Sequence, residues 1–186
     1  GKAVRMTPGT TSHDARFADL PSGPAALAGI VQGLLIHQHI ASTYGVELSP
    51  AQHAEAHVRT VEGMLDGIMG RDPAPLARAR APAERQVGVC RHFTLLHVAM
   101  LRYQGIGARP RCGFSAYFEK GKFVDHWVTE YWDDGRSRWV LVDSQLDPHQ
   151  RELFGIDFDP LNVPRGQFLV AGEAWTRCRA GTARPQ

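Results

Sequence analysis

The chain has 186 residues, of which 43% are hydrophobic, and this length predicts one well-packed domain rather than two. Its 21 lysines and arginines against 19 aspartates and glutamates leave a formal net charge of +2, so no global field favours nucleic acid or an anionic membrane. No stretch reaches the ~20 apolar residues that span a bilayer, and no basic-then-apolar leader opens the chain. We therefore expect a soluble, cytoplasmic protein that binds neither nucleic acid nor membrane.

The N-terminal residues differ in composition from the rest of the chain. Residues 1–24 are rich in Gly, Pro, Ser, Thr and charged side chains and hold few apolar anchors, which predicts an extended or mobile arm. Residues 25–186 are then expected to form the single domain.

Two helices are predicted at the start of this domain. Apolar residues recur near helical spacing over residues 25–45, and Gly45 is a natural stop, so these residues are predicted to form the first helix. Ser49 as N-cap and Pro50 at the first helical position begin a second periodic segment, which ends at Gly70. The sequence thus predicts a helical N-terminal half.

A third helix follows a proline-rich loop over residues 71–85. It is predicted to run from Cys90 to Gln104 and to end at Gly105. Its residues are apolar on nearly every side, which is typical of a helix buried in the centre of a protein.

The pattern then changes from helices to strands. Residues 108–118, 125–132 and 138–144 are rich in aromatic and β-branched residues and are separated by the turn sequences EKGK and DDGR, which predicts a three-stranded antiparallel meander. Residues 144–186 carry Pro and Gly every few positions and are expected to be irregular, with one short helix near residues 166–174.

The turn between the last two strands suggests a functional pair. Asp134-Gly135 is the strongest two-residue turn signal in the chain, and a hairpin centred on it places His126 directly across from Asp143. Cross-strand neighbours share a face and lie close enough for a carboxylate to hold an imidazole N–H. This prediction depends on the turn, because a slip of one residue would put the two side chains on opposite faces.

Cys90 completes a possible catalytic set. Taken singly, each residue also fits a structural role: Cys90 as a small buried side chain, His126 as a core histidine and Asp143 as a turn residue. Together they match what a thiol nucleophile requires, which is a helix N-terminus and an imidazolium to favour the thiolate, and a carboxylate to orient the ring.

The segments GVCRHFTLLHVAMLRYQGIGARPRCGF, DHWVTEYW and RWVLVDSQLD resemble, in order and spacing over about residues 85–148, the Cys, His and Asp blocks of the bacterial transglutaminase-like domain. That superfamily is related to papain-type cysteine proteases. The resemblance implies an α+β fold with a papain-like/transglutaminase-like core, in which a central buried helix packs on an antiparallel sheet beside N-terminal helices. It also implies Cys90 as nucleophile, His126 as general base and Asp143 as the residue that orients it. Arg91 stands where animal crosslinking enzymes usually carry Trp, so glutamine–lysine crosslinking is not implied.

The implied chemistry is an acyl transfer through a thioester, without a metal or other cofactor, on a peptide or a small amide or thioester substrate. Hydrolysis of an amide or peptide bond is the first expectation. An amide-forming acyltransferase or transamidase would use the same residues, and a catalytically idle binding module would keep only the fold. Gln86 is a possible second donor to the oxyanion, beside the backbone N–H of Cys90, and Trp127 is a possible wall of the substrate groove.

Other candidate residues receive structural interpretations. His53 and His57 have the spacing of a helical metal pair but lack a third ligand, so no metal site is expected. His37 is interpreted as a core or helix-packing histidine. Cys112 is predicted to be a buried thiol facing away from the catalytic side, and Cys178 has no partner that can be assigned. The sequence predicts no oligomeric state.

Overall fold

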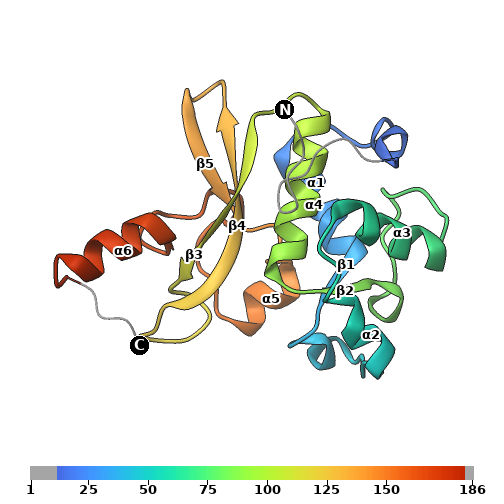
Figure 1. Cartoon of the computed structure of the whole chain (residues 1–186), viewed down its shortest axis with the longest axis horizontal. Coiled ribbons are helices and arrows are strands. Elements are labelled where there is room, and N and C mark those ends of the chain that lie inside the picture. The colour runs from blue at the N-terminus through green and yellow to red at the C-terminus, as the bar shows by residue number, and fades with distance from the viewer. Residues whose placement is uncertain (1–11, 183–186) are drawn as a thin grey trace.

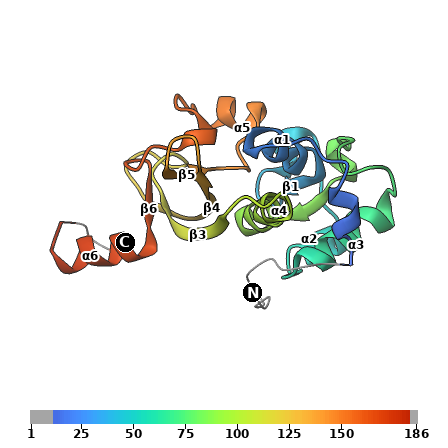
Figure 2. The same ribbon diagram turned by 90° about the horizontal axis from the view of Figure 1, so that it is seen from above.

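A central helix organises the structure of this protein. The structure is a computed structural model, and it describes residues 12–182. This helix, α4 (Cys90–Tyr103), lies between a group of N-terminal helices and an antiparallel sheet (Figures 1 and 2). Ten of its 14 residues are buried, as expected for a helix that is apolar on nearly every side. Over the described part of the chain, no helix is long and apolar enough to cross a bilayer.

The described part of the chain that precedes α4 forms three α-helices and a small parallel sheet on one side of it. Their bounds are α1 (Pro24–Leu34), α2 (Pro50–Glu55), α3 (Val61–Arg71), β1 (Leu35–His37) and β2 (Gln86–Gly88). Apolar side chains of α1, α3 and α4 form the largest core cluster. Strands β1 and β2 pair in parallel, and His37 lies beside Gly88 in their register. This pairing brings the end of β1 next to the start of α4.

Both predicted N-terminal helices are shorter than expected. The first ends at Leu34, where the chain turns into β1, because Leu35 and Ile36 are buried as a strand and their backbone pairs with β2. The second has the predicted cap at Ser49 but breaks into α2 and α3, since the hydroxyl of Thr60 accepts the N–H of Gly63 and begins a new helix.

The predicted meander is present in a four-stranded sheet. The strand order is β5-β4-β3-β6, with bounds β3 (Ala108–Ser115), β4 (Val124–Asp133), β5 (Arg138–Val142) and β6 (Phe168–Val170). The sequence analysis missed β6, which has only three residues and pairs antiparallel to β3. It also missed α5 (Pro148–Leu153), while the expected late helix is α6 (Ala171–Arg179). Helix α6 projects from the body, and none of its residues is buried (Figure 2).

The register between β4 and β5 differs from the predicted one by two residues. Trp132 lies opposite Trp139, so the loop comprises residues 134–137 and is not centred on Asp134-Gly135. The direct pairing of His126 with Asp143 was therefore wrong. Because the shift is even, both side chains remain on the same face of the sheet, where they are diagonal neighbours.

Part of the predicted N-terminal arm is built into the core. Residues 1–11 lie outside the described residues, but Asp14–Phe17 form a short 3-10 helix. The ring of Phe17 is buried and meets Tyr103 edge-on, with 5.6 Å between ring centroids. Phe17 and Leu20 both lie in the main core cluster, and the ring of His13 is hydrogen-bonded to Asp66 of α3, so this segment is fixed although its composition resembles that of a mobile arm.

A buried histidine connects the two halves of the fold. His97 of α4 is fully buried, and its Nε2 donates to the backbone carbonyl of Pro24 at 3.0 Å. Its Nδ1 accepts from the hydroxyl of Thr129 on β4 at 3.1 Å. Burial lowers the pKa of His97 from 6.5 to about 4, so the ring is neutral at physiological pH. One neutral side chain thus holds α1, α4 and β4 together.

This arrangement predicts a loss of stability in mild acid. The unfolded chain binds a proton at His97 with a pKa of 6.5, whereas the folded protein binds it with a pKa of about 4. The stability that the neutral ring contributes is therefore fully present above pH 6.5 and decreases as the pH falls toward 4. Between pH 8 and 5, the free energy of unfolding should fall by roughly 2 kcal/mol more in the parent protein than in His97→Gln. Urea unfolding at both pH values measures the difference, and an equal fall in both proteins would contradict it.

Candidate active site

The start of α4 is held in place around Cys90, which is its first residue. Val89 is extended and acts as N-cap, and its N–H donates to Nδ1 of His92 at 3.0 Å. Nε2 of the same ring donates to the carbonyl of Val58 at 2.8 Å. Gly88 allows this approach, because a Cβ there would lie 2.8 Å from the His92 side chain. The cysteine therefore sits on a backbone that cannot shift freely.

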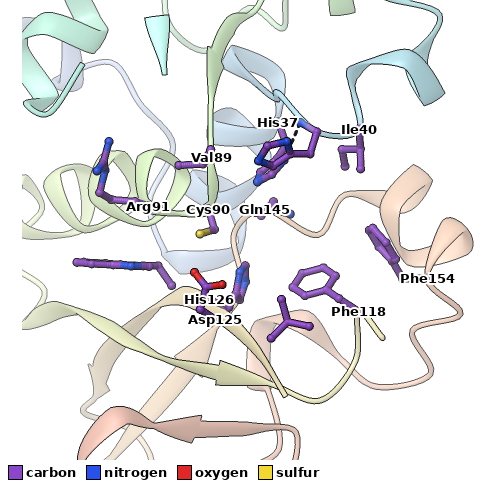
Figure 3. A pocket seen from close by; sticks show the side chains of 13 residues that line it. His37, Ile40, Val89, Cys90, Arg91, Phe118, Asp125, His126, Gln145 and Phe154 are labelled. Carbon is purple, nitrogen blue, oxygen red and sulfur yellow. Dashed lines mark hydrogen bonds between the residues drawn. The ribbon is translucent and has the colours of Figure 1, made fainter. Parts of the chain in front are cut away.

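His126 and Asp143 meet on the sheet beside this helix end. His126 lies on β4 and Asp143 directly after β5, and they are 2% and 1% exposed. Nε2 of His126 donates to Oδ2 of Asp143 at 2.7 Å. The backbone N–H of Asp143 donates to the carbonyl of Pro160 at 2.8 Å, which fixes the chain where it leaves the strand. The structure thus brings His126 and Asp143 into contact and places Cys90 beside His126 in one cavity wall, where Figure 3 shows the two latter residues.

Two further donors serve the carboxylate of Asp143. The hydroxyl of Tyr117 donates to Oδ2 at 2.6 Å, and the backbone N–H of Gln145 donates to Oδ1 at 3.1 Å. The Tyr117 ring also meets the ring of His126 edge-on at 5.9 Å. A buried carboxylate needs such partners to remain ionised. The sequence analysis missed Tyr117, because it follows β3 in a segment whose spacing does not reveal its partner.

The electrostatics of the site favour a charged imidazole. Burial by itself lowers the pKa of His126, but the charge and hydrogen bond of Asp143, together with the neighbouring Cys90 side chain, outweigh it and raise the pKa to about 10. Since Nε2 is bonded to Asp143, Nδ1 is the nitrogen left for the thiol. Figure 3 shows the Cys90 sulfur on the same side of the cavity as the His126 ring.

A cavity of about 480 Å³ opens beside Cys90. Its wall has an apolar part and a charged part. Ile40, Phe118 and Phe154 form the apolar part, and Phe118 lies edge-on to both His126 and Phe154 at 4.8 and 4.9 Å. Arg91 and Asp125 are on the charged part (Figure 3). The remaining lining residues are His37, His39, Val89, Cys90, Val124, His126, Trp127 and Gln145.

The two predicted accessory residues have different positions. Trp127 lines the cavity, as the groove prediction requires. Gln86 does not: it is buried in β2, and its carboxamide lies against Gly67 of α3. The prediction of Gln86 as an oxyanion donor is corrected for this reason, since its side chain points toward the helical layer and not toward Cys90.

His37 lies in the cavity wall instead. The residue was interpreted as a core or helix-packing histidine, but it ends β1, next to Gly88 in the register. Its Nδ1 accepts the backbone N–H of His39 at 3.4 Å, which leaves the proton on Nε2. Burial, then the charges of His39 and His126, lower its pKa to about 3. The cavity therefore contains a neutral histidine that can donate one N–H.

Other predicted positions are also settled by the structure. Cys112 is exposed on β3, so the prediction of a buried thiol was wrong, and Cys178 lies on α6. Helix α2 ends at Glu55, so His53 and His57 do not lie on one continuous helix. Within residues 12–182, no three His, Cys, Asp or Glu side chains gather in a way that could hold a metal ion.

Comparison with known proteins agrees with this geometry. The model of the transglutaminase-like superfamily matches residues 40–144, a range that contains Cys90, His126 and Asp143. The chain belongs to this superfamily. The predicted α+β fold, with a transglutaminase-like core of a buried helix on an antiparallel sheet, is confirmed.

The solved structures that are similar to this transglutaminase-like chain include the following one. It is a crystal structure of a Cytophaga hutchinsonii protein provisionally assigned as a cysteine protease, with 16% identity and a TM-score of 0.42. The similarity covers 89% of this chain and 44% of the other, so the chain spans less than half the length of that neighbour. A search of curated proteins finds no match.

The hydrogen bond of Tyr117 gives a test of the site's stability. Tyr117→Phe removes a donor from a buried carboxylate and should lower the free energy of unfolding by about 1–3 kcal/mol. Urea unfolding measures this loss. Tyr103→Phe removes the same atom from an exposed side chain of α4 and should change stability by less than about 0.5 kcal/mol. Equal effects of the two variants would contradict a stabilising role for Tyr117.

Proposed function

We propose that this transglutaminase-like chain is a cysteine-dependent acyl-transfer enzyme with a Cys90–His126–Asp143 triad, and that it hydrolyses an amide or peptide bond through a thioester. The observation that supports this most strongly is the hydrogen bond between Asp143 and His126 in a cavity wall that also contains Cys90. A helix N-terminus, an imidazolium and a buried carboxylate together favour a thiolate at this position.

The first half of the reaction forms the thioester. The Cys90 thiolate attacks the substrate carbonyl, so a carbon–sulfur bond forms and the carbonyl electron pair moves to oxygen. His126 then gives its Nδ1 proton to the leaving nitrogen as the carbon–nitrogen bond breaks. Asp143 keeps the Nε2 proton hydrogen-bonded throughout, which holds the ring with Nδ1 toward the sulfur.

The second half restores the enzyme. A water molecule gives a proton to Nδ1 of His126 and attacks the thioester carbonyl, and the acid leaves as the carbon–sulfur bond breaks. An amine in place of water would give an amide, which is the acyltransferase or transamidase alternative. The same three residues carry both reactions, so the choice depends on which nucleophile reaches the cavity.

Two N–H groups suit the oxyanion that forms in each half. The backbone N–H of Cys90 is among the first of α4, where helical N–H groups have no partner within the helix. Nε2–H of His37 is the second candidate, in place of Gln86, because the neutral ring lies in the cavity wall. A donor fixed in advance toward a developing charge is a strong source of catalysis.

Selective alkylation tests the nucleophile. At pH 6.5, iodoacetamide should modify Cys90 roughly 100-fold faster than Cys112, because the raised pKa of His126 keeps an imidazolium beside Cys90, whereas partial desolvation of the sulfur raises the pKa of the Cys112 thiol although the residue as a whole is exposed. His126→Gln should abolish this preference. Peptide mass spectrometry of the modified protein measures both rates.

The exposed His53→Gln serves as the matched control, since it makes the same replacement on α2 away from the cavity and should keep the preference. Equal and slow labelling of Cys90 and Cys112 in the parent protein would instead support the idle binding module.

Partitioning of the acyl group distinguishes hydrolase from acyltransferase. With p-nitrophenyl acetate, the protein should release p-nitrophenol in a burst of one equivalent per Cys90 and then turn over slowly, as expected for a thioester that accumulates. Acetate as the main product in the presence of 10 mM glycine amide would support hydrolysis. Mainly acetylated amine would support the acyltransferase, and Cys90→Ala should show neither.

A further inference from the structure

Two of the described residues in the cavity wall carry a buried polar atom without a hydrogen-bond partner, Arg91 at its Nε and Gln145 at its Oε1, and only the second is an acceptor. Gln145 is 4% exposed and lines the cavity, and its Oε1 is buried without a hydrogen bond. Figure 3 shows the side chain between His37 and His126 in that view. Buried carbonyl oxygens are almost always hydrogen-bonded in folded proteins. An unpartnered oxygen at this place is therefore evidence for something that binds there.

The orientation of this carboxamide is set by a series of hydrogen bonds that leads away from the cavity. Nε2 of Gln145 donates to Oε1 of Gln150 at 2.9 Å. Burial raises the pKa of the Tyr44 hydroxyl, whereas the amide of Gln150 faces this hydroxyl closely enough to lower that pKa in part. The same hydroxyl donates to Oδ2 of Asp147 at 2.8 Å.

The direction of this series cannot be reversed. Asp147 caps α5 and accepts the backbone N–H of Gln150 at 2.8 Å, and a carboxylate can only accept. Tyr44 must therefore give its one hydroxyl proton to Asp147 and accept from Gln150. That leaves Oε1 of Gln150 to face Nε2 of Gln145. The oxygen of Gln145 is consequently the atom left for the cavity.

The backbone around Gln145 is held as firmly as its side chain. Its N–H donates to Oδ1 of Asp143 at 3.1 Å, and its carbonyl accepts the N–H of Asp147 at 2.9 Å. The residue thus lies in a tight turn between the carboxylate that orients His126 and the cap of α5. An acceptor held in this way is organised before any ligand arrives.

We infer that Gln145 Oε1 recognises the acyl donor by accepting a hydrogen bond from an N–H group next to the reacting carbonyl. The inference rests on the proposed function, because it assigns a role within the same cavity. The substrate class that fits best is an amide or peptide with a neutral N–H, which the site should prefer to an ester of the same shape. The oxygen carries no charge and the nearby wall includes Phe118 and Phe154, so a neutral donor suits the position better than an ammonium group.

A pair of alkylating reagents of nearly equal shape tests this recognition. N-methyl-2-iodoacetamide carries an N–H where methyl iodoacetate carries an ester oxygen, and with both reagents the thiolate displaces iodide as a carbon–sulfur bond forms. For each reagent, the rate of Cys90 alkylation is divided by the rate at which the same reagent alkylates free cysteine at the same pH. The amide preference of the site is the normalised rate for the amide reagent divided by the normalised rate for the ester reagent.

The parent protein should show an amide preference of about tenfold, because the ester leaves a buried acceptor unpaired. Gln145→Leu should reduce it to about one while leaving the rate with methyl iodoacetate within about twofold. Gln86→Met is the matched control, since it also removes a buried carboxamide with an unpartnered oxygen, but outside the cavity, and it should keep the full preference.

A second variant keeps Gln145 and removes what orients it. Tyr44→Phe deletes the hydroxyl that sets the direction of the series, so the carboxamide can turn and the amide preference should fall by at least about twofold, with the ester rate unchanged. This result would identify Tyr44 as a positioning residue. It also keeps the inference testable if Gln145→Leu fails to fold.

Failure of the inference and failure of the proposed function give different results. If Cys90 reacts much faster than Cys112 with both reagents but shows no amide preference, or if Gln145→Leu keeps the preference, the inference is overturned and the nucleophile stands. If Cys90 is no more reactive than Cys112 with either reagent, the proposed function itself is overturned.

Discussion

The buried carboxylate of Asp143 is the group on which the rest of the site depends. A charge with 1% exposure is tolerated only when hydrogen bonds replace water, and here three donors from three segments do so: the His126 ring, the Tyr117 hydroxyl and the Gln145 backbone. Each hydrogen bond stabilises the carboxylate and also fixes the position of the group that donates it. The hydrogen-bonded group therefore sets the position of the His126 ring, one wall of the cavity and the turn into α5 together.

Three histidines show how strongly this carboxylate matters. His37 and His97 are neutral because desolvation lowers their pKa values to about 3 and about 4. His126 is as buried as His97, but contact with Asp143 reverses the direction and raises its pKa to about 10. One ring is thus suited to proton transfer, one to donating a neutral N–H in the cavity and one to joining helices to the sheet. The difference lies in their neighbours.

Much of the site could be predicted from the chain because its elements are local. The apolar pattern of α4 and the turn signals of the meander placed Cys90 at a helix start and His126 and Asp143 on one face of neighbouring strands. The direct pairing was wrong by two residues, yet the shared face survived, because side chains alternate with a period of two. Short elements such as β1 and β6 were missed, since three residues carry too little pattern to separate a strand from the end of a helix.

The sequence by itself determined the fold class, the central helix and the three candidate catalytic residues, since periodicity and turn chemistry act between near neighbours along the chain. Only the tertiary structure decided which other groups surround them. Tyr117 reaches Asp143 across the sheet, His37 replaces Gln86 beside Cys90, and Gln145 presents an unpaired oxygen, because pairing of distant segments and not local spacing fixes these contacts. The charge of His126 is also decided by the tertiary structure, since the pKa of the ring depends on the groups that folding places around it.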